Sequence, residues 1–158
     1  MNRLVITIGI PGCGKSTYAK KLISLNPDWV HISRDNIRYE YVSDQAHYYD
    51  HEDEVYKEFC NRITMHLMKN KTVIADATHL TTGSRKKLIN SLGITPDEII
   101  AIWFTTPFEV CMKRNQAREG ITRVPDKVMY QMKNRFRPPS INEGYNQIVK
   151  VIGDNDSI

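Results

Sequence analysis

A segment near the N-terminus fits the phosphate-binding loop pattern G-x-x-x-x-G-K-[ST] at every fixed position, and it reads Gly9-Ile10-Pro11-Gly12-Cys13-Gly14-Lys15-Ser16. In such a loop, glycines let backbone N–H groups turn toward a phosphate, and the following helix N-terminus adds partial positive charge. The pattern assigns Lys15 to the β- and γ-phosphates of a nucleoside triphosphate and the Ser16 hydroxyl to Mg²⁺. A glycine-rich turn would also match, but a β-branched apolar run precedes this loop and a helical pattern follows it. The segment therefore predicts a nucleoside triphosphate site.

A second polar segment, Ser33-Arg34-Asp35-Asn36-Ile37-Arg38, follows another apolar run. A carboxylate beside a hydroxyl that attacks phosphorus can take the hydroxyl proton, and Asp35 has this residue type at a predicted strand end. Arg38, one helical turn later, could clamp an anionic acceptor with two hydrogen bonds. Alternatively, Asp35 caps a short helix and Arg38 is a solvated surface charge. The sequence alone leaves both interpretations open.

Two further segments complete the candidate site. Asp76 ends an apolar strand, where P-loop enzymes often place an acid for the metal or its waters, although it could instead cap the turn at 78–82. Basic residues surround Glu119-Gly120, and these are Lys113, Arg114, Arg118 and Arg123. A basic, mobile segment could close over a triphosphate and neutralise charge during transfer, whereas the alternative is a solvated helix end.

Strand and helix patterns alternate along the chain. Predicted strands cover 4–8, 29–33, 72–76, 98–105 and 147–152, and predicted helices cover 17–25, 50–68, 82–92, a stretch from 107, and 125–136. This alternation predicts an α/β protein with a parallel sheet covered on both faces and ligands at the carboxyl ends of the strands. Tyr18, Leu22 and Leu25 share the core face of the first helix. Arg85-Lys86-Lys87 is typical of solvated helix surface, with a weaker possibility that it steers a nucleic-acid backbone.

The whole chain has 158 residues, which suits one domain over 1–152 with a flexible tail at 153–158. Its three cysteines lack metal-ligand spacing, so we expect reduced thiols in a cytoplasmic protein. The longest apolar run is too short to span a bilayer, and the polar N-terminus is unlike a signal peptide. A net charge of +4 mildly favours a polyanionic partner. No obligate protein partner is evident.

Together, these segments resemble the kinase domain of bacteriophage-type 5′-polynucleotide kinases, within the broader group of P-loop phosphotransferases. The resemblance covers nearly the whole chain and implies a three-layer α/β fold, with a five-stranded parallel sheet flanked by helices and a small helical lid at about 114–125. Residues 6–17 are similar to the donor site of that family. The implied donor contacts in the loop are Gly9, Pro11, Gly12, Cys13, Gly14, Lys15, Ser16 and Thr17.

The other motifs of the resemblance correspond to the acceptor site and the lid. Arg34-Asp35 with Arg38 is similar to the acceptor motif, which implies Asp35 as general base and Arg38 as the group that holds the phosphate flanking the attacking hydroxyl. Asp76-Ala77-Thr78-His79-Leu80 resembles a D-x-T-N-L-like turn, with His79 in place of the usual Asn and Thr78 near the substrate. The segment 113–118 resembles the lid, in which Arg114 and Arg118 contact the donor phosphates. Val124-Pro125 matches the pair that packs against the terminal base of the acceptor.

The resemblance implies an ATP- and Mg²⁺-dependent kinase that moves the γ-phosphoryl group to the 5′-hydroxyl of DNA or RNA, in an intracellular setting that includes a phage-infected host. Many relatives continue into a phosphatase domain that opens with D-x-D-G-T. This sequence instead stops at Asp154-Asn155-Asp156-Ser157-Ile158, so the kinase domain alone is expected here. Lys15, Asp35, Arg38 and Arg118 are the expected catalytic residues, and Ser16 and Asp76 the expected metal site. A kinase of a nucleoside, nucleotide or other small hydroxyl metabolite remains the alternative. Asp35 disfavours a nucleotide-dependent binding module without phosphotransfer, because such a module needs no base for an acceptor hydroxyl.

Overall fold

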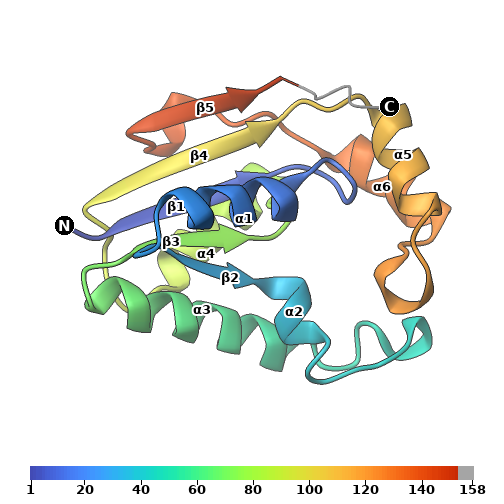
Figure 1. The fold of residues 1–158 in the computed structure, drawn as a ribbon, viewed down its shortest axis with the longest axis horizontal. Coiled ribbons are helices and arrows are strands. Elements are labelled where there is room, and N and C mark those ends of the chain that lie inside the picture. Colours follow the sequence, from blue (N-terminus) through green and yellow to red (C-terminus); the bar gives the residue numbers. More distant parts are fainter. Residues whose placement is uncertain (153–158) are drawn as a thin grey trace.

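The computed structural model describes residues 1–152, in which strands and helices alternate as expected (Figure 1). The elements are β1 (Arg3–Ile8), α1 (Lys15–Leu25), β2 (Val30–Ser33), α2 (Arg34–Arg38), η1 (Gln45–His47), α3 (Glu52–Met68), β3 (Thr72–Asp76), α4 (Thr82–Ser91), β4 (Glu98–Phe104), α5 (Phe108–Gln116), η2 (Gly120–Thr122), α6 (Asp126–Arg135), η3 (Ile141–Glu143) and β5 (Gln147–Val151). The tail predicted at 153–158 lies outside the described residues. None of the helices within 1–152 has the length and apolar character needed to cross a membrane.

The five strands form one parallel sheet in the order β2-β3-β1-β4-β5, which confirms the predicted fold class. Each predicted strand and helix is present, with ends that differ by one or two residues. Helices cover both faces of the sheet (Figure 1). Because the strands are parallel, their carboxyl ends meet at one edge of the sheet.

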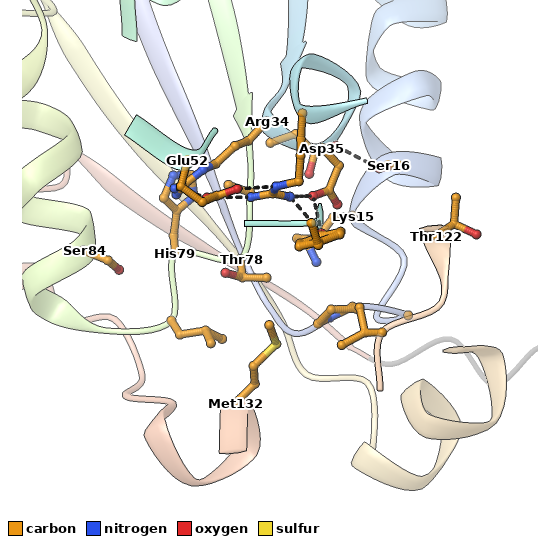
Figure 2. Close-up of a pocket in the computed structure, with 18 of the residues that line it drawn as sticks. Lys15, Ser16, Arg34, Asp35, Glu52, Thr78, His79, Ser84, Thr122 and Met132 are labelled. Atoms are coloured by element: carbon orange, nitrogen blue, oxygen red, sulfur yellow. Dashed lines mark hydrogen bonds and ion pairs between the residues drawn. The ribbon is translucent and has the colours of Figure 1, made fainter. Parts of the chain in front are cut away.

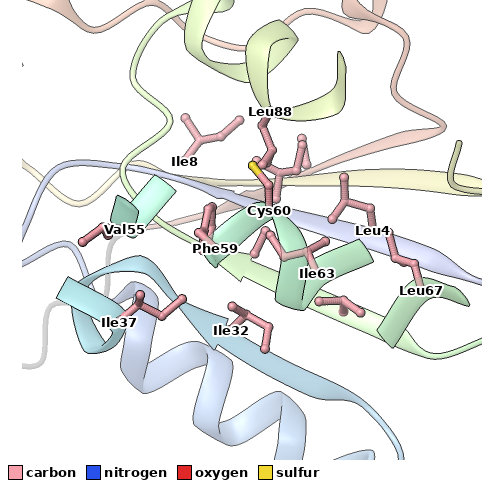
Figure 3. Packing of buried hydrophobic residues seen from close by; sticks show 14 of the residues in the cluster. Leu4, Ile8, Ile32, Ile37, Val55, Phe59, Cys60, Ile63, Leu67 and Leu88 are labelled. Carbon is pink, nitrogen blue, oxygen red and sulfur yellow. The ribbon is translucent and has the colours of Figure 1, made fainter. Parts of the chain in front are cut away.

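The core has two halves, one on each face of the sheet. Side chains alternate along β1, so Leu4, Ile6 and Ile8 enter the cluster under α3 and α4, whereas Val5 joins the cluster under α1, α5 and α6. In the first cluster, α3 contributes apolar side chains spaced four apart, among them Phe59, which is completely buried (Figure 3). Burying one such side chain contributes about 1.5–3 kcal/mol. Packing on both faces of the sheet therefore holds the strands in place, and with them the polar residues at the strand ends.

The prediction that Leu25 faces the core is wrong, because its side chain is 69% exposed. Leu25 is the last residue of α1, so no further helical turn covers it. The buried face consists instead of Ala19, with Tyr18, Leu22 and Ile23 packed around it.

The sheet register brings three loops together. β2 lies beside β3 with Ser33 opposite Asp76, and β3 lies beside β1 with Ala75 opposite Ile6. The glycine loop after β1, the start of α2 after β2 and the turn after β3 therefore converge at one edge of the sheet. This convergence defines the candidate site.

Candidate active site

The glycine loop has the backbone that a phosphate cradle requires. Gly12 and Gly14 have φ angles of 85° and 101°, which L side chains rarely adopt, and a Cβ on Gly12 would lie 2.5 Å from the carbonyl oxygen of Cys111. No side chain caps the N-terminus of α1, and its first turn has no acidic residue. Free N–H groups at a helix N-terminus fit the phosphates of a nucleotide.

The predicted donor residues surround this loop. Lys15 donates from Nζ to the carbonyl oxygen of Ile10 at 3.0 Å, so its ammonium group lies within the loop. Arg114 donates from Nη1 to the carbonyl oxygen of Gly12 at 3.2 Å, which holds α5 against the loop. The predicted loop residues that line the cavity are Pro11, Gly12, Gly14, Lys15, Ser16 and Thr17. Gly9 and the buried Cys13 lie behind this lining rather than on it.

Asp76 and Ser16 meet at the predicted metal position. Asp76 Oδ2 accepts a hydrogen bond from Ser16 Oγ at 2.9 Å and lies 2.8 Å from Nε2 of His31. Burial raises the pKa of Asp76, but the His31 hydrogen bond and the Lys15 charge outweigh it, so the net shift is downward and the group is a carboxylate. The cap interpretation is wrong, because Thr81 caps α4. Ionised carboxylate and hydroxyl oxygens are a donor set that suits Mg²⁺.

Asp35 lies at the start of α2 with its carboxylate facing the cavity (Figure 2). Its Oδ1 accepts hydrogen bonds from Arg38 Nη1 and from the Tyr48 hydroxyl, the latter at 3.2 Å. Its Oδ2 has no hydrogen-bond partner among residues 1–152, and the side chain is 58% exposed. Ser33 Oγ accepts from the Asn36 N–H and caps α2, so the interpretation of Asp35 as the helix cap is wrong.

Arg38 is buried, with an exposed fraction of 6%, which rules out a solvated surface charge. Its Nε and Nη2 donate to the two oxygens of Glu52 at 2.5 and 3.0 Å, a bidentate pair across α2 and α3. Its Nη1 also donates to Tyr48 at 2.8 Å. Burial opposes the charge of Arg38, yet these hydrogen bonds and acidic neighbours raise its pKa overall. Arg38 therefore holds Asp35 and joins it to Glu52.

Arg34 lies on the other side of Glu52, to which it donates from Nη2 at 3.0 Å. Its guanidinium group covers the ring of Tyr56 at 4.9 Å, a cation–π contact. The buried Nε of Arg34 has no hydrogen-bond partner among the described residues. Burial raises the pKa of Glu52, but the hydrogen bonds and charges of Arg38 and Arg34 lower it further, so the net shift is downward.

The turn after β3 places Thr78 and His79 at the cavity wall. His79 has a φ angle of 44°, in the left-handed region that Asn and His enter more readily than most residues. The prediction that Arg85 lies on solvated surface is wrong, because Arg85 is completely buried. It donates to the carbonyl oxygen of His79 at 2.8 Å and pairs with Glu143 at 2.8 Å, so the fold uses its charge to hold this turn.

The segment between α5 and α6, where the resemblance implies the lid, contains one short helical turn, η2. Arg118 is exposed and lines the cavity. Gln45 donates from its side chain to the carbonyl oxygen of Ile121 at 2.5 Å, which links the loop after α2 to this segment. Val124 and Pro125 also line the cavity, and the buried Asn115 side chain bonds both the N–H and the carbonyl of Val124, at 2.9 and 2.6 Å.

All of these segments border one cavity of about 420 Å³. Its lining has six cationic residues, Lys15, Arg34, Arg38, Lys87, Arg118 and Arg135, and three acidic residues, Asp35, Glu52 and Asp76. The lining therefore has an excess of positive charge. The structure thus brings the predicted loop, Asp35 and Asp76 together with Arg118 and Val124-Pro125 around a single volume.

Several residues around the site had no role in the sequence analysis. Tyr48 and Glu52 hold the Asp35–Arg38 pair, His31 contacts Asp76, and Asn115 fixes the backbone of Val124. No motif marks the first three, because each lies on an element whose neighbours are set by the sheet order. Asn115 belongs to the segment that resembles a lid, and this resemblance was the signal that could have marked it as a site residue.

Known kinases resemble this chain in sequence and in fold. A 27% identical curated relative, over 141 residues, is the L-seryl-tRNA(Sec) kinase of Methanococcus maripaludis, and the match covers 86% of this chain and 53% of the relative. The chain thus spans about half the length of that relative. Among solved structures, a fungal RNA kinase has a TM-score of 0.66 at 21% identity, over 98% of this chain and 76% of that chain. A gluconokinase from Sinorhizobium meliloti 1021 has a TM-score of 0.63 at 17% identity, over 96% and 82%.

At such identities, the structural likeness shows a shared fold, and these kinases are named for different acceptors. The resemblance to polynucleotide kinases thus holds at the level of the P-loop kinase fold. The family model described as AAA domain, AAA_33, matches residues 4–139. The chain therefore belongs to the AAA_33 family and has the P-loop kinase fold.

Proposed function

We propose that this chain is an ATP-dependent kinase that transfers the γ-phosphoryl group to the 5′-hydroxyl of a polynucleotide, DNA or RNA. The observation that carries the proposal is Asp35, which lines the same cavity as Lys15 and whose Oδ2 has no hydrogen-bond partner among residues 1–152. In this proposal, residues 1–152 form one kinase domain, with 114–125 as its lid.

On the donor side, the loop N–H groups and Lys15 bind the β- and γ-phosphates of ATP. Within residues 1–152, Lys15 Nζ hydrogen-bonds only to a neutral carbonyl and a thiol sulfur, so it can move to a phosphate without leaving a carboxylate there unpaired. Ser16 and Asp76 would hold Mg²⁺, which supplies positive charge to the β- and γ-phosphate oxygens. Arg118 on the lid side adds a further cation to the γ-phosphoryl group, and Arg114 supports the loop.

On the acceptor side, Asp35 Oδ2 accepts the proton of the attacking hydroxyl. The new bond joins the acceptor oxygen to the γ-phosphorus, the bond from that phosphorus to the β–γ bridging oxygen breaks, and ADP leaves. Arg38 and Tyr48 hold Oδ1, which orients the free oxygen. Glu52 holds Arg38 in turn, so a buried network keeps the base in place.

The rest of the cavity supports a polyanionic acceptor. Thr78 and the apolar pair Val124-Pro125 line it, and Asn115 fixes the position of that pair, which would contact the terminal base. Arg34 and the remaining N–H of Arg38 would face the phosphate next to the attacking hydroxyl. The excess of cationic residues matches a chain of phosphates better than a neutral metabolite.

A kinase that acts on another hydroxyl is the second candidate. The curated relative named as a seryl-tRNA kinase favours a serine hydroxyl carried by tRNA, and small hydroxyl metabolites remain possible acceptors in this fold. These candidates share the donor site and differ only in the acceptor.

The deciding experiment supplies γ-labelled ATP and Mg²⁺ with a panel of acceptors: 5′-hydroxyl oligonucleotides, nucleoside 3′-monophosphates, nucleosides, seryl-tRNA and simple sugars. We expect oligonucleotides and nucleoside 3′-monophosphates to be used about 10- to 150-fold better than nucleosides, because one charge-assisted contact to the flanking phosphate contributes about 1.5–3 kcal/mol. Arg38→Ala should narrow this gap. Labelling of seryl-tRNA or a sugar, with none of oligonucleotides, would refute the proposal.

A further inference from the structure

The cavity continues past Asp35 to an end that the proposed reaction does not use. Figure 2 shows Ser84 on α4 at the opposite side of the pocket from Thr122 of the lid, and Met132 on α6 below the site. Lys87 lies one helical turn after Ser84, and Arg135 one turn after Met132, and both line the same cavity.

Hydrogen bonds join the residues that follow α6 to α4 and to the turn before it. The N–H of Arg137, just after α6, donates to the carbonyl oxygen of Leu80 at 2.8 Å. Arg85 of α4 donates from Nη2 to the carbonyl oxygen of Pro138 at 3.5 Å. The chain just after Arg135 is thus bonded to α4 and to the residue Leu80 shortly before it, and Arg135 and Lys87 line the cavity on either side of this junction.

The cations at this end have no acidic partner. Lys87 is exposed, and its Nζ lies 4.5 Å from the centre of the Tyr56 ring, the ring that Arg34 also covers. Within residues 1–152, neither Lys87 nor Arg135 pairs with a carboxylate. All three acidic residues of the lining already have partners: Arg38 holds Asp35, Arg34 and Arg38 hold Glu52, and Ser16 and His31 contact Asp76. Positive charge therefore gathers here without compensation.

We infer that Lys87 and Arg135 form a second phosphate subsite, which takes the phosphate on the 3′ side of the second nucleotide of the acceptor. The inference rests on the proposed function. Arg34 and Lys87 both lie over the Tyr56 ring, and Arg34 shares Glu52 with Arg38, so a line of cations leads from Arg38 to this subsite. The preferred acceptor is then a single strand with at least two phosphates beyond its 5′-hydroxyl.

The test compares two acceptors, a nucleoside 3′-monophosphate and a 5′-hydroxyl dinucleotide that also carries a 3′-phosphate. In the wild type, we expect the second phosphate to raise kcat/KM roughly tenfold. Lys87→Ala and Arg135→Ala should each lose most of this gain and keep the rate on the monophosphate. The logarithm of kcat/KM for the dinucleotide should also depend less steeply on the logarithm of salt concentration, by about 0.7 for each lost phosphate contact.

Matched controls lie on the same helices. Lys86 is exposed and does not line the cavity, and Lys133 lies over the Phe108 ring at 4.5 Å, so Lys86→Ala and Lys133→Ala should match the wild type. If the wild type uses oligonucleotides without any gain from the second phosphate, or if the controls lose as much as Lys87→Ala, the subsite is refuted and the proposed function stands. If the wild type labels no nucleotide acceptor, the proposed function fails and the subsite fails with it.

Discussion

His79 should make the stability of the protein depend on pH in a way that one substitution removes. Its ring is buried and its Nδ1 lies 2.8 Å from the carbonyl oxygen of Thr7. A carbonyl only accepts, so Nδ1 carries the hydrogen, and a second proton would have to bind the buried Nε2. Burial, with a smaller contribution from the Arg34 charge, lowers the pKa of His79 from 6.5 to about 4.

The sign and size of the effect follow from this pKa. Between pH 6.5 and about 4 the unfolded chain binds a proton at His79 that the folded protein does not, so stability falls as pH falls through this range. At 1.36 kcal/mol for each pH unit, the loss approaches about 3 kcal/mol. His79→Asn places a non-titrating residue at the left-handed φ angle of 44°, which Asn tolerates well.

The assay is urea unfolding of both proteins at a series of pH values from about pH 7 to about pH 4, followed by circular dichroism. From about pH 7 to about pH 4, the free energy of unfolding of the wild type should fall by about 3 kcal/mol more than that of His79→Asn. His47 is exposed and Asp44 raises its pKa, so His47→Asn is a control with a small effect of opposite sign. Parallel pH profiles for the wild type and His79→Asn would refute the argument, because they would mean that the folded protein protonates His79 at its ordinary pKa.

Three further outcomes test the site and its support. Lys15→Ala should lower turnover by about 10³-fold, because it removes the cation at the β- and γ-phosphates, and near-normal turnover in a γ-phosphate transfer assay would show that the donor site lies elsewhere. Asp35→Asn should lower turnover by about 10²–10⁴-fold without changing the affinity for ATP measured by calorimetry, and a parallel loss of ATP binding would contradict its role as base. Arg85→Ala should lower the free energy of unfolding by about 3–5 kcal/mol, because it leaves Glu143 unpaired, and a loss below about 1 kcal/mol in urea titrations would show that the pair contributes little.

The fold could be predicted from the sequence because its signals are local. Apolar runs rich in β-branched residues mark the strands, and the spacing of four along α3 marks its buried face. The glycine loop is also local, since Gly12 and Gly14 adopt backbone angles that few other residues reach. Leu25 shows the limit of such patterns, because a helical repeat does not say where the core that covers it ends.

The partners of the site residues were decided only by the tertiary structure. The sequence presents Arg38 and Glu52 as charges fourteen positions apart, and nothing local reveals the bidentate pair that buries Arg38 behind Asp35. Arg85 and Lys87 occupy one basic run, yet the first is buried against Glu143 and the second lines the cavity. A charge is exposed or paired according to what the sheet order brings beside it, and that order depends on contacts between segments distant in the chain. The sequence alone therefore determined the strands, the helices and the phosphate loop, whereas packing determined which charges remain available for a substrate.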